Sequence, residues 1–238
     1  MPVAVITGGS RGIGRATVEL LASHGWRTAF CYHSSDAAAD EVAKKTGAFA
    51  YRADVADAEA VDRFIDAVMR REGRIDLLVN NAGVSVSGLF TDITAEQWRR
   101  MSDVNIGGTL NCTRSVLPHM IRRKSGRIVN ISSVWGVTGG SCEVHYSATK
   151  AAIIGFTRAL AKEVGPSGIT VNCIAPGVID TDMNARLSQE DTAELIGETP
   201  LGRIGAPIDV ARTVEFLAGD GGSFVTGQVI SVDGGWCV

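Results

Sequence analysis

Several features that mark particular classes of protein are missing from this chain of 238 residues. No apolar run reaches the roughly 18 residues that a membrane helix needs. The N-terminus has no charged segment before its first apolar run, so the sequence predicts no signal peptide. Lys and Arg number 23 and Asp and Glu 26, and the net charge of −3 provides no basic footprint for nucleic acid. We therefore expect a cytoplasmic protein that binds neither membranes nor nucleic acid.

Cysteine and histidine are too scattered to indicate a disulfide framework or a metal site. The five cysteines are odd in number and contain no CxxC pair, and the four histidines show no metal-ligand spacing. This usage is typical of a reducing compartment, and it predicts no bound metal.

Glycine is the residue present in excess. The chain has 28 glycines in 238 residues, about 12%, against a usual value of about 7%. Hydrophobic residues make up 45% and charged residues 21%, as in ordinary globular proteins. The length suits one α/β domain over 1–238.

Short apolar runs alternate with stretches of helical length. The expected strands are 3–7, 27–32, 49–52, 76–80, 127–131, 169–174 and 228–232. The expected helices include 13–24, 58–71, 95–123, 146–164 and 207–217. This alternation predicts an α/β fold with a doubly wound, parallel, seven-stranded sheet of Rossmann type in three α/β/α layers. The polar segment 180–199 is predicted to be a flap over the site, and the alternative is a surface loop containing a helix.

A glycine cluster follows the first expected strand and opens the first expected helix. Its spacing is G-x3-G-x-G, which lets the turn bend and lets the backbone approach a pyrophosphate at the helix N-terminus. The residues expected to contact the cofactor here are Gly8, Ser10, Arg11, Gly12, Ile13 and Gly14.

The end of the second expected strand indicates which dinucleotide is bound. Units that bind NAD usually have an acid there for the ribose 2′-OH, but the first acid in this chain is Asp36, beyond the strand. A 2′-phosphate would instead meet Ser34, Ser35, His33 and the guanidinium of Arg11. The sequence therefore predicts NADP(H).

Tyr146 and Lys150 lie four residues apart, on one face of an expected helix. A phenol can donate a proton to a carbonyl oxygen while hydride reaches the carbon. We expect the Lys150 cation to lower the pKa of Tyr146 toward the working pH. Upstream, Ser132 and Ser133 end a strand at the sheet edge where such folds bind ligands.

With these motifs in order, the chain resembles the short-chain dehydrogenase/reductase family over essentially its whole length. The matching pieces are Thr7-Gly8, Gly12-Ile13-Gly14, Asp54-Val55, Asn80-Asn81-Ala82-Gly83, Asn105, Ser133, Tyr146, Lys150, Pro176-Gly177 and Thr181. The resemblance implies that Ser133, Tyr146, Lys150 and Asn105 are catalytic, with Asn105 holding a water that relays protons through Lys150. It also implies cofactor contacts from His33, Ser34, Asp54, Val55, Asn81, Ala82, Gly83, Tyr146, Lys150, Pro176, Gly177, Ile179 and Thr181.

Within the family, the chain looks most similar to 3-oxoacyl-acyl-carrier-protein reductases. It departs from them in 132–144 and in the ending Gly234-Gly235-Trp236-Cys237, where it is closer to the 5-aminopentanone reductases that act on a modified lysine of elongation factor P. There Glu143 could pair with the amino group of the substrate, or it could be a rim carboxylate near a helix start. Trp135, Glu143 and Met183 are the expected substrate contacts.

The resemblance implies an NADPH-dependent enzyme that reduces a ketone to a secondary alcohol. Its partners would be a small or carrier-bound ketone, acyl carrier protein or elongation factor P, and copies of itself in a homotetramer or dimer. A remote alternative is a nucleotide-sensing protein without activity, although such proteins typically lose the Tyr or the Lys.

Overall fold

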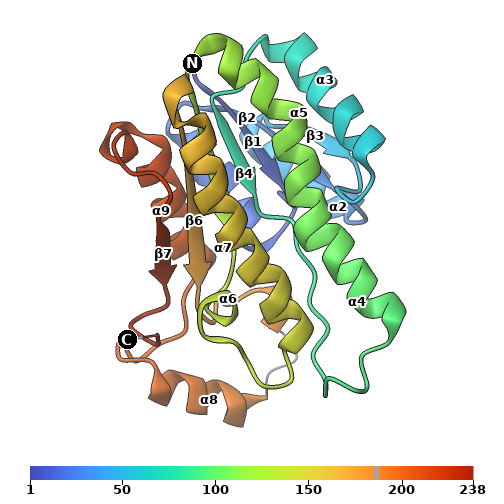
Figure 1. The fold of residues 1–238 in the computed structure, drawn as a ribbon, viewed down its shortest axis with the longest axis vertical. Coiled ribbons are helices and arrows are strands. Elements are labelled where there is room, and N and C mark those ends of the chain that lie inside the picture. The colour runs from blue at the N-terminus through green and yellow to red at the C-terminus, as the bar shows by residue number, and fades with distance from the viewer. Residues whose placement is uncertain (185–187, 238) are drawn as a thin grey trace.

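A single parallel sheet organises the chain in the computed structural model, which describes residues 1–184 and 188–237 (Figure 1). Its strands lie in the order β3-β2-β1-β4-β5-β6-β7, and every neighbouring pair is parallel. They are β1 (Val3–Thr7), β2 (Arg27–Tyr32), β3 (Phe49–Arg52), β4 (Leu77–Asn80), β5 (Gly126–Ile131), β6 (Ile169–Pro176) and β7 (Val229–Val232). The doubly wound, seven-stranded α/β prediction is therefore confirmed.

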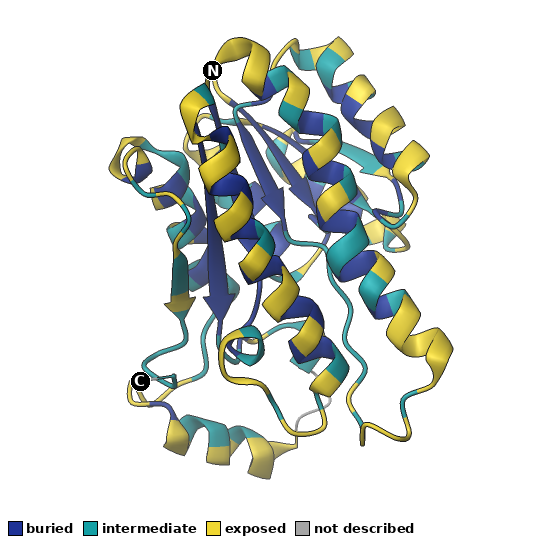
Figure 2. Ribbon diagram, viewed as in Figure 1, coloured by how far each residue is buried: buried dark blue, intermediate teal, exposed yellow. Residues whose placement is uncertain are grey.

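Helices cover both faces of the sheet, which is why its strands are almost continuously apolar. One face packs against α3 (Ala58–Glu72), α5 (Gly108–Arg123) and α7 (Val144–Val164). The other packs against α1 (Gly12–Ser23), α2 (Asp36–Thr46) and α9 (Pro207–Ala218). Figure 2 shows the central strands buried and the helices striped, with their buried side toward the sheet.

The strand and helix ends follow local chemistry. Helix α3 begins where the Asp57 carboxylate accepts hydrogen bonds from the amides of Glu59 and Ala60, and it ends at Gly73, whose φ is 72°. Strand β6 continues two residues past its expected end, because Pro176 still lies in register with Val232. The pairing with β5 ends at Ile174, so the missing N–H of Pro176 interrupts no ladder bond on that side.

The single helix expected over 95–123 is divided in the structure. Helix α4 (Ala95–Ser102) passes through a π turn, Asp103–Gly107, into α5. The turn brings Asn105 inward, with only 2% of its surface exposed. Apolar periodicity could not show this, because a π turn inserts a residue into the helix without ending it.

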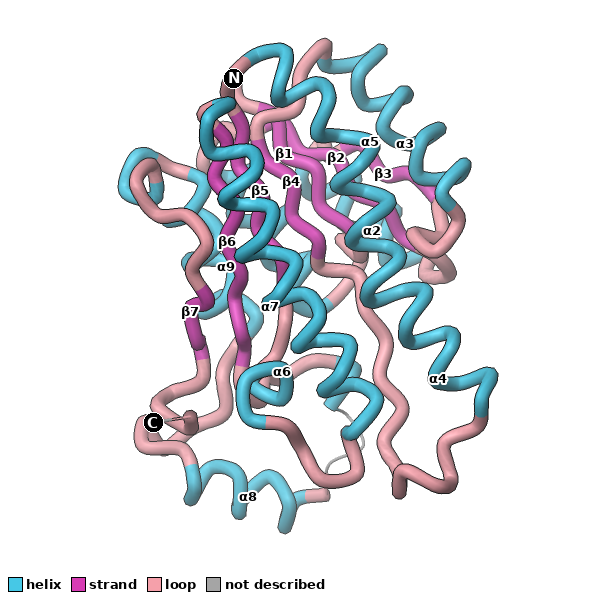
Figure 3. The backbone as a smooth tube through the Cα atoms, viewed as in Figure 1, coloured by secondary structure: helices cyan, strands magenta, loops and turns pink. Residues whose placement is uncertain are grey.

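The segment expected to be a flap has helical structure at both ends. A 3₁₀ turn covers Asp182–Asn184, and α8 (Gln189–Glu198) begins at Ser188, whose hydroxyl accepts from the amide of Asp191. Residues 185–187 of this expected flap lie outside the described residues. Figure 3 shows α8 beyond the carboxyl ends of β6 and β7. Within 1–184 and 188–237, no helix is both long and apolar enough to cross a bilayer.

Candidate active site

The loop between β1 and α1 has an open backbone that only glycine provides. Gly8 and Gly12 have φ of +67° and +53°. A Cβ at Gly14 would lie 2.1 Å from the Gly8 carbonyl oxygen and 2.6 Å from Asn81 Nδ2. These glycines leave the first turn of α1 accessible, and a helix N-terminus favours anions. The loop therefore fits the pyrophosphate of a dinucleotide.

Thr7 and Asn81 hold this loop in place. Asn81 Nδ2 donates to the carbonyl oxygens of Thr7 and Gly8, at 2.9 and 3.2 Å. In return, Thr7 Oγ1 accepts from the amides of Asn81 and Ala82, both at 2.9 Å. Thr7 is absent from the expected site residues. A single hydroxyl at the end of an apolar strand could have indicated that it holds the loop that follows.

The end of β2 has the polar character expected for a 2′-phosphate. The carbonyl oxygen of His33 accepts from Arg52 Nε at 3.1 Å, so a guanidinium that the motifs did not predict lies beside this turn. The Asp36 carboxylate lies 3.9 Å from Arg52. The pKa of Tyr32 is raised, first by burial and then by its hydrogen bond with Asp36. The neighbours of Asp36 are therefore the last residues of β2 and β3.

Asp54 and Val55 lie just beyond β3, at the same sheet edge. Arg100 of α4 binds the Asp54 carboxylate at 2.8 Å, and His33 lies 3.7 Å from it. Burial acts to raise the pKa of Asp54, but the hydrogen bond from Arg100 and other contacts lower it overall. Val55 packs closely on Gly108, because a Cβ added at Gly108 would lie 2.5 Å from Val55 Cγ2. This packing fixes the position of Val55, one of the cofactor contacts that the resemblance implies.

The loop after β6 returns to the glycine loop. Ile179 is 3% exposed and pairs with Gly205 in an isolated bridge. A Cβ at Gly12 would lie 3.3 Å from Thr181 Cγ2, so Thr181 covers the start of α1. Asp182 then meets Arg11 at 3.6 Å, with both side chains mostly exposed. Met183, an expected substrate contact, is 49% exposed.

Ser133 and Tyr146 come together from two elements. Ser133 follows β5 and caps α6 (Val134–Thr138), with its Oγ accepting from the Trp135 amide at 3.2 Å. Tyr146 lies in the first turn of α7, 9% exposed. Burial raises the pKa of Tyr146 to about 12, while the Ser133 hydroxyl lowers it and the Glu143 carboxylate raises it further.

The expectation that Lys150 pulls the pKa of Tyr146 toward neutrality is wrong for this structure. The Lys150 ammonium nitrogen lies 5.5 Å from the Tyr146 ring centroid and donates to the Ile131 carbonyl oxygen at 2.9 Å. Burial lowers the pKa of Lys150 itself to about 8. Burial is the largest cause of both shifts, and it favours the uncharged form of each group.

Asn105 joins the π turn to the loop after β4. Its Nδ2 donates to the Val84 carbonyl at 2.9 Å and to Thr149 Oγ1 at 3.0 Å, while its Oδ1 accepts from the Val84 amide at 2.8 Å. A Cβ at Gly83 would lie 3.3 Å from both Asn105 Oδ1 and Lys150 Nζ. Asn105 and Lys150 thus meet at Gly83. The water relay assigned to them stays a prediction. Thr149 was missed because its place between Tyr146 and Lys150 gives no signal of its own.

Two loops close one side of the site next to Tyr146. Ser85 Oγ donates to Glu143 Oε2 at 2.9 Å, and the Gly88 amide donates to the Cys142 carbonyl oxygen at 2.9 Å. Glu143 immediately precedes α7 and is partly buried. Ser85 was not predicted, since nothing in the sequence indicates which residue faces Glu143.

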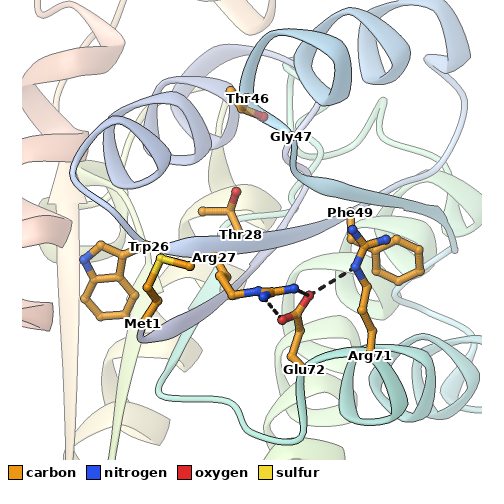
Figure 4. A pocket seen from close by; sticks show the side chains of 9 residues that line it. All are labelled: Met1, Trp26, Arg27, Thr28, Thr46, Gly47, Phe49, Arg71 and Glu72. Atoms are coloured by element: carbon orange, nitrogen blue, oxygen red, sulfur yellow. Dashed lines mark hydrogen bonds and ion pairs between the residues drawn. The ribbon is translucent and has the colours of Figure 1, made fainter.

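The opposite edge of the sheet also has hollows, lined by other residues. Figure 4 shows the side chains that line one of them, a cavity of about 210 Å³ with Trp26 and Phe49 among its lining residues. Glu72 there pairs with both Arg27 and Arg71, so the charges of the hollow satisfy one another. The candidate active site is therefore at the carboxyl edge, where strand ends and motifs coincide.

Arg122, Arg123 and Lys124 form a basic cluster at the end of α5, on the opposite edge of the sheet from the candidate site. Arg123 binds the Asp76 carboxylate at 2.7 Å and the Ile75 carbonyl oxygen at 2.9 Å, beside the start of β4. These contacts account for the charge of Arg123, and cations at the end of a helix also suit its dipole.

Comparisons with known proteins agree with this geometry. The family profile described as "Enoyl-(Acyl carrier protein) reductase" matches residues 8–237. The chain is 44% identical to a 3-oxoacyl-[acyl-carrier-protein] reductase of Synechocystis sp., over 98% of this chain and 96% of that protein. It is 42% identical to a protein of the same description from Staphylococcus aureus, with the same coverage.

A solved structure extends this similarity to the fold. A mutant short-chain dehydrogenase/reductase of Serratia marcescens is 33% identical and superposes with a TM-score of 0.93, covering 100% of this chain and 98% of its own. The match in sequence and in fold extends over nearly every residue, including the edge where Ser133, Tyr146 and Lys150 meet. The chain therefore belongs to the short-chain dehydrogenase/reductase family of oxidoreductases.

Proposed function

We propose that this protein is an NADPH-dependent reductase that converts the ketone of a 3-oxoacyl thioester to a secondary alcohol. The observation that carries the reductase chemistry is the buried, protonated phenol of Tyr146 beside Ser133. Both residues lie at the same edge of the sheet as the glycine loop. The thioester comes from the relatives, which are described as 3-oxoacyl-[acyl-carrier-protein] reductases. An acyl carrier protein is the corresponding partner, and a homotetramer the corresponding assembly.

Each catalytic side chain has one role in this reaction. When bound, a reduced nicotinamide supplies the hydride to the carbonyl carbon. Ser133 Oγ accepts from the Trp135 amide, which leaves its hydroxyl proton to bond the carbonyl oxygen. Tyr146 then delivers a proton to that oxygen, for which the protonated phenol is the required form.

Lys150 and Asn105 would restore the proton that Tyr146 loses. With a pKa of about 8, Lys150 is mostly charged at neutral pH and can still release a proton close to it. Asn105 holds the loop that passes between them and fixes Thr149, the residue before Lys150. In this proposal the water assigned to Asn105 would return a proton to Tyr146 through Lys150.

The preference for NADPH rests on the side chains around the expected 2′-phosphate. Asp36 follows the strand at the start of α2, beside Tyr32 and 3.9 Å from Arg52, and it is not at the strand end where an acid would meet a ribose hydroxyl. Arg52 adds a guanidinium beside His33, and Arg11 is exposed in the glycine loop, where only the exposed Asp182 pairs with it among the described residues. An exposed pair at 3.6 Å is weak and would yield to a phosphate.

Arg11→Ala should reduce affinity for NADPH but not for NADH. A charged hydrogen bond to a phosphate contributes about 1.5–3 kcal/mol, so we expect the Kd of NADPH to rise about 10- to 100-fold. Titration of both cofactors by fluorescence measures this change. Arg70→Ala, an exposed cation on α3, is the matched control. An unchanged ratio of the two Kd values would remove Arg11 from the phosphate site.

One observation favours a second candidate function. The Glu143 carboxylate lies close enough to Tyr146 to raise the pKa of its phenol, and Ser85 holds it there. A carboxylate beside the proton donor suits a ketone that also carries an ammonium group, such as the 5-aminopentanone on a modified lysine of elongation factor P. The alternative is a structural role, in which Glu143 only joins the loop after β4 to the loop before α7.

The two substrates can be compared directly. We expect NADPH oxidation to be fast with acetoacetyl-CoA and slow with a small ketone bearing a terminal amine, and Glu143→Gln to leave the thioester reaction nearly unchanged. In that variant the pKa of Tyr146 should fall, because a negative charge near the phenol is removed. Turnover of the amino ketone alone, with a KM that rises at least about tenfold in Glu143→Gln, would replace the thioester proposal by the second candidate.

A further inference from the structure

Two tryptophans that lie far apart in the sequence meet beside the active site. Trp135 is in α6, and Trp236 is in the C-terminal segment, defined here as 233–237. Their ring centroids are 4.9 Å apart and the rings are nearly perpendicular, at 89°. This edge-to-face arrangement is a favoured geometry for aromatic pairs. Trp135 is an expected substrate contact, whereas Trp236 has no role in the reaction proposed above.

Trp236 also binds the helix that follows the expected flap. Its indole Nε1 donates to Glu198 Oε2 at 3.3 Å, and Glu198 is the last residue of α8. Close by, the Leu201 amide donates to the carbonyl oxygen of Gly234 at 3.1 Å. The C-terminal segment is therefore joined to α8 and to the turn after it.

Trp135 provides the connection to the catalytic serine. Its backbone amide donates to Ser133 Oγ, and its ring is confined on a second side, because a Cβ at Gly140 would lie 2.8 Å from Trp135 Cδ2. A shift of Trp135 would therefore move the group that orients the serine hydroxyl. Ser133 in turn is the side chain expected to bond the carbonyl oxygen.

The C-terminal segment is a well-held support for Trp236. The Asp233 carboxylate accepts from the amides of Gly235 and Cys237, at 3.0 and 3.1 Å. The Gly177 amide donates to the Val232 carbonyl oxygen at 3.0 Å, and a Cβ at Gly177 would lie 2.8 Å from Asp233 Cβ. The segment thus lies directly on the loop that leaves β6.

We propose that Trp236 is a positioning residue for carbonyl reduction, which fixes α8 to the α6 turn and thereby sets the orientation of Ser133. The series of contacts runs from Glu198 through the indole of Trp236 to Trp135 and its amide on Ser133 Oγ. The kinetic part of this inference rests on the proposed function. The structural part, which is the attachment of α8, does not.

The first test removes the contacts of Trp236 in steps. Trp236→Ala loses the ring and the N–H, and we expect kcat for acetoacetyl-CoA to fall about 10- to 100-fold, since small misplacements of a positioned group cost this much. Trp236→Phe keeps a ring against Trp135 but loses the N–H, so its kcat should lie between those of wild type and Trp236→Ala. The Kd of NADPH should stay unchanged in both variants, which separates positioning from a general loss of structure.

Glu198 allows the hydrogen bond to be tested without touching either ring. Glu198→Ala should lower kcat in the same direction as Trp236→Phe, and Glu198→Gln should restore it, because an amide oxygen can still accept from the indole. Glu194→Ala, an exposed carboxylate one turn earlier on α8, is the matched control and should behave as wild type.

A second measurement needs no turnover. Amide hydrogen exchange over 189–198 should be faster in Trp236→Ala than in wild type, measured on the protein alone. If exchange is faster but wild type does not reduce acetoacetyl-CoA, the thioester proposal fails, and the kinetic series is repeated on the amino ketone. The role of Trp236 is overturned if exchange in Trp236→Ala is unchanged. It is also overturned if exchange is faster but kcat is unchanged on the ketone that the wild type reduces.

Discussion

Tyr146→Phe should abolish most of the carbonyl reduction while leaving the protein folded and able to bind NADPH. The substitution removes only the phenolic hydroxyl, which is the proton donor, and general acid catalysis contributes roughly 10²- to 10⁴-fold. Burial holds the pKa of Tyr146 at about 12, so the hydroxyl is in its donating form throughout the neutral range. We therefore expect kcat to fall by at least about 100-fold, measured as NADPH oxidation with acetoacetyl-CoA.

A matched control separates chemistry from packing. Tyr51→Phe removes another hydroxyl from an aromatic residue, in β3, where the ring packs on Phe64 with centroids 5.5 Å apart. That variant should keep the wild-type rate. A Tyr146→Phe enzyme that retains its turnover would show that another group protonates the carbonyl oxygen, and the proposed mechanism would have to be abandoned.

Gly14→Ala should nearly eliminate cofactor binding. Its Cβ would lie 2.1 Å from the Gly8 carbonyl oxygen and 2.6 Å from Asn81 Nδ2, which real Cβ contacts do not allow. The loop or α1 must move, and overpacking of this kind costs roughly 1–3 kcal/mol of folding stability. Because the displaced atoms are those that would hold the pyrophosphate, we expect the Kd of NADPH to rise about 100-fold or more, equivalent to about 3 kcal/mol.

Thermal unfolding and cofactor titration measure the two effects of Gly14→Ala separately. Gly155→Ala is its control, since Gly155 lies in the interior of α7 and a Cβ there has no neighbour within 4 Å among the described residues. That change should keep cofactor affinity and add up to about 1 kcal/mol of stability, because alanine is the better helix former. Wild-type NADPH affinity in Gly14→Ala would mean that the pyrophosphate is bound elsewhere.

Local patterns predicted the architecture well, because a strand covered on both faces must be apolar at nearly every position. The run 3–7 became β1, and all seven expected strands appear within a few residues of their predicted ends. Helix continuity was predicted less well. Both halves of 95–123 are helical, and the π turn at Asn105 depends on Val84 and Thr149, which come from other elements.

The electrostatics of the site could not be predicted from spacing alone. A tyrosine and a lysine four residues apart suggest mutual attraction, which would lower the pKa of the phenol. In the folded chain both groups are more than nine-tenths buried, and desolvation raises the pKa of Tyr146 and lowers that of Lys150. The sign of the effect depends on how much water the surrounding helices and strands exclude.

The sequence by itself determined the parallel sheet, the glycine loop and the order of the catalytic motifs, because these depend on residue type and on spacing within one or two elements. The tertiary structure alone decided which distant groups meet: Ser85 with Glu143, Arg100 with Asp54, and Trp135 with Trp236. Such contacts join segments tens of residues or more apart, and no local pattern records them. Their geometry is fixed only when parallel strands bring their carboxyl ends to one edge and the loops pack against each other there.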